Sequence, residues 1–323
     1  MRAVLCRAWG GPETLTIEEV ATPEPGPGEV RIRVLAAGVN FPDVLIIQKK
    51  YQVQPPLPFT PGAEIAGEVE AAGPGTTLRP GTRVAGFCSL GGFAEQVVVA
   101  ESACIALPDA VGMEQAASLL LAYGTSWHAL RDRALLRAGE TLLVLGAGGG
   151  VGLAAVDIGH AMGARVVAAA SSAAKLAAAV EYGAAATIDT GEASLRDAIA
   201  RTCGKAGPDV IYDPVGGDLT EPAFRSIAWG GRHLVVGFAA GATPSIALNL
   251  PLLKGASLVG VFWGGFARHQ PHEQRAETEE MMSWLAAGRL RPKVSRRYRL
   301  ADVATALTDM AERRVIGKVV IVP

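Results

Sequence analysis

Three glycines with a regular spacing are the first feature of the chain that points to chemistry. Gly146, Gly149 and Gly152 follow the apolar run "TLLVLG" and precede a stretch with helical spacing. A turn of this kind lets backbone N–H groups approach a pyrophosphate and lets the helix pack closely on the strand before it. We therefore expect a dinucleotide-binding turn, in which Gly150 and Val151 also face the cofactor.

The residues after the next predicted strand indicate which dinucleotide fits. The strand "ARVVAAA" runs into Ser171, Ser172 and Lys175 and has no acidic residue there. An acid at this point would accept hydrogen bonds from both ribose hydroxyls of NAD and would repel the 2′-phosphate of NADP. Serine hydroxyls, a helix N-terminus and a lysine instead favour the phosphate, so we expect NADP(H). The alternative is that Ser172 only caps the helix and that Lys175 is a solvated lysine.

Later strands of the same region end in residues that can also face a ligand. Open α/β sheets bind ligands at the carboxyl ends of their strands. Asp213, in "YDPVGG", would touch a ribose or merely cap the next helix. The turns "GFAAGA" and "VFWGG" supply four further candidates for cofactor binding, which would otherwise be plain turn or core residues: Gly237, Phe238, Phe262 and Trp263.

The elements that must position these residues follow from the rhythm of the sequence. From about residue 121 onward, apolar strands, glycine turns and helices alternate, which predicts a doubly wound parallel sheet with right-handed crossovers. The first 120 residues consist of short β-branched runs broken by glycine and proline, such as "EVRIRVLAAGV" and "RVAGF", and indicate mainly antiparallel β structure. The last stretch has a helix pair and a strand that cannot bury their own apolar faces. We expect it to return to the first domain, which then comprises 1–120 and 264–323, with 121–263 as the cofactor domain.

Bulk properties exclude several classes of function. The formal net charge is −1, which gives no general attraction to nucleic acid or anionic lipid. No run of about eighteen apolar residues is present to span a bilayer. The start "MRAVLCRAWG" lacks the apolar core of a secretory leader, so a cytoplasmic location is expected. The four cysteines are scattered, which argues against disulfides and a cysteine-rich zinc site.

Several motifs of the first domain carry a family resemblance. "AAGVNFPDVLIIQKKY", "PLPFTPGAEIAGEVEAAG", "GTRVAGF" and "GGFAEQVVV", followed by the glycine turn, resemble the medium-chain dehydrogenase/reductase superfamily. The resemblance is strongest to its zinc-free quinone oxidoreductases, the zeta-crystallin-like branch that includes the quinone oxidoreductase-like proteins. It covers essentially the whole chain and implies a GroES-like catalytic domain beside a Rossmann cofactor domain.

The same resemblance implies that the reaction uses no metal. Zinc-dependent alcohol dehydrogenases of the superfamily carry a cysteine where this chain has Asn40 and a G-H-E motif where it has Gly62-Ala63-Glu64. Two of the three protein ligands of a catalytic zinc are therefore missing. None of the five histidines falls in metal-ligand spacing with a cysteine or another suitable partner. We expect no metal to be bound.

Catalytic residues are carried over from the same motifs. Asn40 is expected to border the nicotinamide, or to be only a turn residue, and Asp43 is expected to organise that wall. Tyr51 would face the substrate, either as a hydrogen-bond donor to the developing oxyanion or as an aromatic wall of a dry cleft. Phe262 and Trp263 would form an apolar lid over the substrate ring. Thr125 and Lys318 complete the expected cofactor contacts.

The implied activity is the reduction of quinones or α,β-unsaturated carbonyls by hydride from NADPH. An enoyl-thioester reductase is the alternative among enzymes, for which Lys49 and Lys50 are the only hint of a basic entrance. A non-catalytic NADPH-binding protein, structural or RNA-associated as zeta-crystallins can be, is the alternative from another class. Thr190 stands where related reductases often have a tyrosine after the third strand, which indicates a moderate preference for NADPH.

Partners are a small-molecule quinone or enone and a second copy of the chain. The sixth strand, "SLVGVFWGG", is expected at the edge of the cofactor sheet and is too apolar to remain open, so a homodimer through this strand is expected. The near-neutral charge argues against nucleic acid as a partner. The basic run "RLRPKVSRRYR", residues 289–299, is read as a solvated segment, with a binding patch as the alternative.

Overall fold

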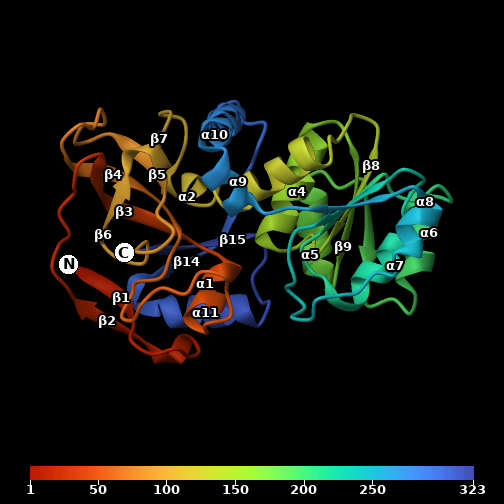
Figure 1. The fold of residues 1–323 in the computed structure, drawn as a ribbon, viewed down its shortest axis with the longest axis horizontal. Helices are drawn as coiled ribbons and strands as arrows, with labels where there is room; N and C mark the ends of the chain where they lie inside the picture. Colours follow the sequence, from red (N-terminus) through yellow and green to blue (C-terminus); the bar gives the residue numbers. More distant parts are fainter. The chain divides into compact units, whose positions relative to one another are not determined.

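Glycines and prolines cut the first third of the chain into short strands, and the computed structural model, which describes residues 1–323, assembles them into one sheet (Figure 1). This sheet belongs to unit 1, formed by 1–122, 278–287 and 292–323. Its strand order is β14-β15-β3-β4-β5-β7, with β6 paired to β3. All its pairings are antiparallel except that between β14 and β15. Mainly antiparallel β structure is thus confirmed.

The elements of unit 1 are short, as the frequent turn residues predict. A separate hairpin pairs β1 with β2. The strands and helices that lie wholly within unit 1 are β1 Arg2–Cys6, β2 Leu15–Glu19, β3 Glu29–Val39, α1 Phe41–Ile47, β4 Glu64–Ala72, β5 Arg83–Phe87, β6 Gln96–Ala100, β7 Cys104–Ala106, α2 Met113–Ala116, β14 Val294–Arg299, α11 Val303–Ala311 and β15 Lys318–Val322.

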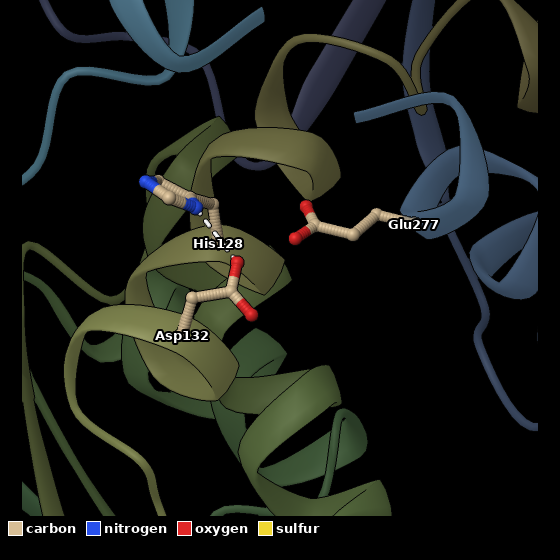
Figure 2. A group of neighbouring side chains, drawn as sticks. All are labelled: His128, Asp132 and Glu277. Carbon is tan, nitrogen blue, oxygen red and sulfur yellow. Dashed lines mark hydrogen bonds and ion pairs between the residues drawn. The ribbon is translucent and has the colours of Figure 1, made fainter. Parts of the chain in front are cut away.

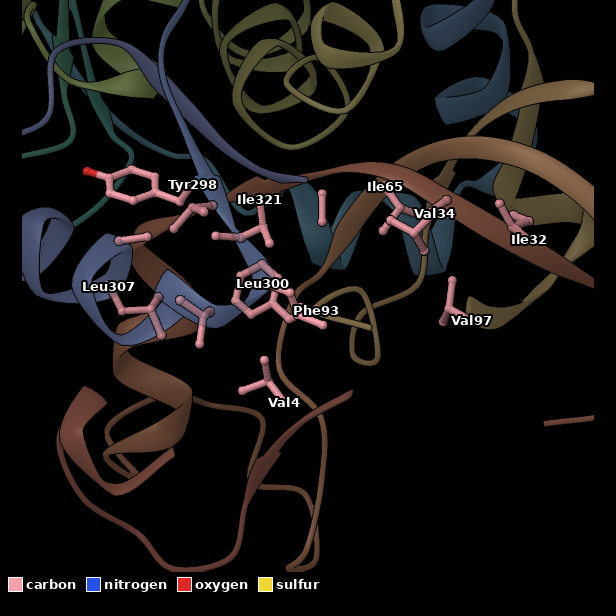
Figure 3. Packing of buried hydrophobic residues seen from close by; sticks show 14 of the residues in the cluster. Val4, Ile32, Val34, Ile65, Phe93, Val97, Tyr298, Leu300, Leu307 and Ile321 are labelled. Carbon is pink, nitrogen blue, oxygen red and sulfur yellow. The ribbon is translucent and has the colours of Figure 1, made fainter. Parts of the chain in front are cut away.

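One hydrophobic core holds the sheet and the last helix of unit 1 together. β-Branched side chains of β3 and β4, such as Ile32 and Ile65, are fully buried, and Phe93 and Leu307 pack into the same cluster (Figure 3). Complete burial of a side chain of this size contributes about 1.5–3 kcal/mol. The core therefore joins β15 and α11, from the end of the chain, to strands that lie more than 200 residues earlier.

The second unit, residues 123–277 and 288–291, contains a parallel sheet with the order β10-β9-β8-β11-β12-β13. Helices lie on both of its faces (Figure 1). The predicted doubly wound α/β fold is therefore confirmed. Its elements are α3 Ala122–Trp127, a π-helical turn His128–Arg133, β8 Thr141–Leu145, α4 Gly150–Ala161, β9 Arg165–Ala170, α5 Ala173–Glu181, β10 Ala186–Asp189, α6 Leu195–Cys203, β11 Val210–Asp213, α7 Thr220–Arg225, β12 Arg232–Val235, α8 Asn249–Lys254, β13 Ser257–Gly260, α9 Trp263–His269 and α10 Pro271–Ala286.

Two segments differ from the expectation. The basic run at 289–299 contains a strand, β14, which pairs with β15 and buries Tyr298. Its arginines face solvent on an edge strand, where charge discourages pairing with other chains. The second difference is the point at which the chain returns to unit 1. The cofactor domain was expected to end at residue 263, whereas contacts group the residues up to Glu277 with unit 2. None of the helices is both long and apolar enough to cross a membrane.

Candidate cofactor and substrate sites

The glycine turn joins β8 to α4 with almost no space for side chains. Gly149 is the N-cap of α4, and its N–H donates to the carbonyl of Gly146 (3.0 Å), which has a positive φ of 61°. A Cβ on Gly152 would lie 2.2 Å from the same carbonyl oxygen. Only glycine allows this approach of helix to turn, which leaves the first N–H groups of α4 open to an anion. The residues present thus fit a dinucleotide pyrophosphate.

Lys175 lies directly against this turn. A Cβ on Gly148 would be 2.4 Å from Cγ of Lys175, so the lysine stem occupies the space that the glycine leaves. Ser172 caps α5 and accepts a hydrogen bond from the backbone N–H of Lys175 (3.4 Å). Ser171 is exposed beside it. The three residues therefore gather at the carboxyl end of β9, next to the glycine turn, as the sequence predicts.

An acidic residue lies one strand away, and the sequence pattern gave it no role. Asp189 ends β10 and pairs in register with Ala170, the last residue of β9. Its Oδ1 accepts the N–H of Gly191 (2.9 Å), so this oxygen is directed to its own turn. Thr190 is held beside β9 by a hydrogen bond from its N–H to the carbonyl of Ala170 (3.0 Å).

Asp213 at the end of β11 serves its own loop. It is buried, and Oδ1 accepts the N–H groups of Val215 (2.9 Å) and Gly216 (2.8 Å). Oδ2 accepts the Thr220 hydroxyl (2.7 Å) and contacts His233 Nε2 (3.2 Å). Burial alone would raise the pKa of this carboxyl, but these hydrogen bonds lower it. The contacts favour the capping role over the ribose contact.

The loop after β12 lies on the loop that Asp213 holds. Gly237 donates to the carbonyl of Asp213 (3.3 Å), and a Cβ on Gly216 would be 2.9 Å from the Phe238 ring. Phe238 keeps 42% of its surface exposed. Its ring therefore covers a glycine turn at the carboxyl edge of the sheet and remains open to a ligand.

The helix that carries Thr125 is fixed to the first turn of α4. Its neighbour Ser126 is fully buried, and the Ser126 hydroxyl donates a hydrogen bond to the carbonyl of Val151 (2.9 Å). Thr125 is half-buried on this helix. The structure thus brings Thr125 near the glycine turn.

Phe262 and Trp263 have different environments. Trp263 is 5% exposed, and a Cβ on Gly124 would lie 2.9 Å from its indole nitrogen. Phe262 is 57% exposed at the start of α9. Of the two expected lid residues, Trp263 is therefore a core residue of unit 2, and only Phe262 is open to a ligand.

Unit 1 contains a buried polar cluster at Asn40. Its Nδ2 donates to Glu64 Oε1 (2.9 Å), and its Oδ1 accepts from Lys318 Nζ (2.5 Å). Lys318 also bonds Glu64 Oε1 (2.6 Å) and the Val39 carbonyl (3.3 Å). The other oxygen of Glu64 accepts the N–H of Leu121 (2.9 Å). Both polar ends of Asn40 are used within the protein, which favours its structural role.

Lys318 was expected to contact the cofactor, but its ammonium group is buried in this cluster. Only 4% of the lysine side chain and none of the Glu64 side chain are exposed. A buried ammonium needs a charged partner, and Glu64 supplies it. Glu64 had no assigned role; the only signal in the sequence is an acid within the apolar stretch "GAEIAGE".

Asp43 and Tyr51 have altered proton affinities. Burial raises the pKa of Asp43 to about 7, although the N–H of Asn40 and the charge of Lys318 oppose this. Oδ2 of Asp43 accepts that N–H (2.8 Å) and so caps α1. Burial, with the charge of Asp43, also raises the pKa of the Tyr51 phenol. Tyr51 therefore stays protonated at neutral pH and able to donate a hydrogen bond.

Two family models match the chain. The model described as "Alcohol dehydrogenase GroES-like domain" matches residues 26–109, within unit 1. The model described as "Zinc-binding dehydrogenase" matches residues 150–287, which begin within the glycine turn and include most of unit 2.

Full-length relatives are similar over both units. Quinone oxidoreductase-like protein 2 of Mus musculus is 38% identical over 325 residues, which cover 99% of this chain and 91% of that protein. Quinone oxidoreductase of Pseudomonas aeruginosa is 37% identical over 321 residues, 98% of each chain. The crystal structure of Escherichia coli quinone oxidoreductase complexed with NADPH superposes with a TM-score of 0.92, at 27% identity and with all of both chains covered.

The buried Lys318–Glu64 pair yields a stability prediction. Lys318→Met should lower the free energy of unfolding by about 3–5 kcal/mol, because it leaves the Glu64 carboxylate buried without a counter-charge. Adding Glu64→Gln should recover part of this loss. Arg2→Met, which breaks an exposed ion pair with Glu95 of similar length (2.7 Å), should cost less than about 1 kcal/mol. Urea denaturation measures all three, and equal losses for the two single variants would contradict the prediction.

Proposed function

Because the chain belongs to the quinone oxidoreductase-like branch of the medium-chain dehydrogenase/reductase superfamily, we propose that it is an NADPH-dependent reductase of quinones or α,β-unsaturated carbonyls that needs no metal for the reaction. The proposal rests on the residues at the end of β9. Two serines and Lys175 lie there beside the glycine turn, and the lysine stem packs on Gly148.

NADP(H) is the cofactor, and each part of it has a matching feature in unit 2. The N-terminus of α4 receives the pyrophosphate through Gly149, Gly150 and Val151. Ser171, Ser172 and Lys175 receive the 2′-phosphate, since hydroxyls and an ammonium group bind an anion that an acid would repel. Thr125, Gly237, Phe238 and Phe262 line the remaining path at the carboxyl edge of the sheet. Asp213, Trp263 and Lys318 are left out because their side chains are buried in structural contacts.

The bound nicotinamide supplies a hydride, and the protein supplies orientation and stabilisation of charge. A quinone or enone that accepts hydride at carbon develops negative charge on oxygen. A protonated Tyr51 donates a hydrogen bond to that oxygen. Asp43 holds the start of α1, the helix that leads to Tyr51, and Asn40 anchors the same start to β4 and β15.

A panel of acceptors tests the proposal. Initial rates of NADPH oxidation should be measured with small quinones, enones and enoyl thioesters and ranked by kcat/KM. Quinones or enones are expected to rank first. A first rank for enoyl thioesters would move the assignment to an enoyl-thioester reductase. No consumption of NADPH with any acceptor would favour a non-catalytic NADPH-binding protein.

The edge of the parallel sheet supports self-association. β13 is the terminal strand, and its Leu258 is 40% exposed. Large apolar side chains are also exposed on and near α8, which precedes it: Trp229, Leu248, Leu252 and Leu253. Open apolar edges favour pairing with another strand. The proposed assembly is a homodimer joined through β13.

Lys175→Ala should separate the two cofactors. A charge-assisted contact to phosphate is worth about 1.5–3 kcal/mol, so the Kd for NADPH should rise about ten-fold or more, with the Kd for NADH nearly unchanged. Fluorescence titration with each dinucleotide measures this. Lys205→Ala, which removes an exposed lysine after α6, is the control and should alter neither Kd. Equal losses for NADPH and NADH in Lys175→Ala would show that the lysine does not bind the 2′-phosphate.

Tyr51→Phe should lower kcat more than it weakens NADPH binding. Loss of one donor to a developing oxyanion costs up to about 3 kcal/mol in the transition state. Steady-state kinetics with the best acceptor, together with an NADPH titration, separate the two effects. An unchanged kcat would reduce Tyr51 to a wall of the site.

Light scattering should give twice the chain mass of 33.4 kDa. Leu258→Lys, which places a charge on the edge strand, should shift the protein toward the monomer. Ile17→Lys, at a residue that is also 40% exposed but lies in the β1–β2 hairpin, should leave the mass unchanged. A monomeric wild-type protein at micromolar concentration would contradict the proposed dimer.

A further inference from the structure

Three side chains with metal-binding chemistry meet in unit 2 on elements that do not form the glycine turn. His128 and Asp132 come from the π-helical turn, and Glu277 comes from α10 (Figure 2). One potential ligand atom from each lies within 4.8 Å of the other two. His128 Nδ1 lies 2.7 Å from Asp132 Oδ2.

The protein holds the imidazole in place from two sides. His128 is 7% exposed, and its ring stacks on Phe266 of α9 with centroids 4.1 Å apart and an angle of 12° between the planes. The π-helical turn itself is a rare element that often occurs at functional sites. The ring plane and the first carboxylate are therefore fixed relative to each other, while the Asp132 side chain keeps 33% of its surface exposed.

The two carboxyl groups lie close to each other beside the imidazole ring. Burial would raise the pKa of Asp132, but hydrogen bonds with His128 and Glu277 and the charge of Arg131 lower it. A hydrogen bond between two carboxyl groups requires a proton on one of them. A cation at the same point would be held by both carboxyl groups.

We propose that His128, Asp132 and Glu277 bind one divalent transition-metal ion, for which Zn²⁺ is the best match. One imidazole nitrogen and two carboxylate oxygens form a donor set that suits zinc, whereas Mg²⁺ and Ca²⁺ prefer oxygen alone. Ligand bonds of about 2.0–2.2 Å require donor atoms roughly 3 Å apart. Rotation of the two carboxylate side chains closes the present separations, and water completes the coordination through the exposed side of Asp132.

The ion would be held by two carboxylates and a neutral imidazole ring, since metal ligands bind in their deprotonated form. The ion then joins the first half of α10 to the π-helical turn. Because the folded protein binds the ion and the unfolded chain lacks the site, the midpoint of thermal unfolding rises with Zn²⁺ concentration. The site serves stability and takes no part in hydride transfer.

Calorimetric titration of metal-free protein with ZnCl₂ tests the site. One ion per chain is expected. Glu277→Gln keeps the shape of the side chain and should weaken binding about ten-fold or more. Glu273→Gln and His272→Gln, at exposed residues of the same helix, are the controls and should bind like the wild type.

Thermal unfolding is a second test that leaves His128, whose ring packs on Phe266, unchanged. Zn²⁺ should raise the midpoint for the wild type and Glu273→Gln, and not for Glu277→Gln or Asp132→Asn. No binding by the wild type, or binding that survives Glu277→Gln and Asp132→Asn, would overturn the site. NADPH oxidation should be equal with Zn²⁺ and with EDTA. A loss in EDTA would contradict the proposed metal-free reaction, and zinc binding without NADPH oxidation would contradict only the proposed function.

Discussion

The approach of α4 to the end of β8 is the constraint on which the cofactor site depends. A Cβ on Gly152 would lie 2.2 Å from the Gly146 carbonyl, so any larger residue would push the helix away from the sheet. The positive φ of Gly146 turns the chain within the same few residues. Because Gly148, within this turn, has no side chain, the stem of Lys175 can lie on it. The anion-binding helix end and the residue proposed to select NADPH are therefore built on one backbone geometry.

The buried charges of unit 1 depend on contacts between residues that are distant in the sequence. Lys318 enters from the last strand and meets Glu64 and Asn40, which belong to the first hundred residues. The ion pair is buried away from water. Lys318 also donates a hydrogen bond to the Val39 carbonyl, and Glu64 also accepts one from the Leu121 N–H. The same cluster surrounds Asp43, whose pKa burial raises to about 7. The charged cluster thus fixes the start of α1, the element that leads to Tyr51, without any side chain in reach of solvent.

Local patterns predicted the elements of the cofactor unit well because each depends on neighbouring residues. The alternation of apolar runs and glycine turns located β8, α4, β9 and the serines that follow it. Side-chain partners distant in sequence could not be found in this way. Nothing local shows that Lys318 pairs with Glu64, or that Glu277 meets His128, because those contacts exist only after the sheet and helices have packed. β14 was missed for a different reason: Tyr298 is the only buried residue of its six, so the segment shows no alternation of apolar and polar residues.

A double-mutant cycle on Gly148 and Lys175 tests the central claim most directly. A Cβ at Gly148 must displace the lysine stem, so Gly148→Ala should weaken NADPH binding more than NADH binding. If the turn and the lysine act as one site for the 2′-phosphate, Lys175→Ala made in the Gly148→Ala background should cost little further NADPH affinity, since the contact is already lost. Additive losses in NADPH affinity, or equal losses for NADPH and NADH throughout the cycle, would contradict the account.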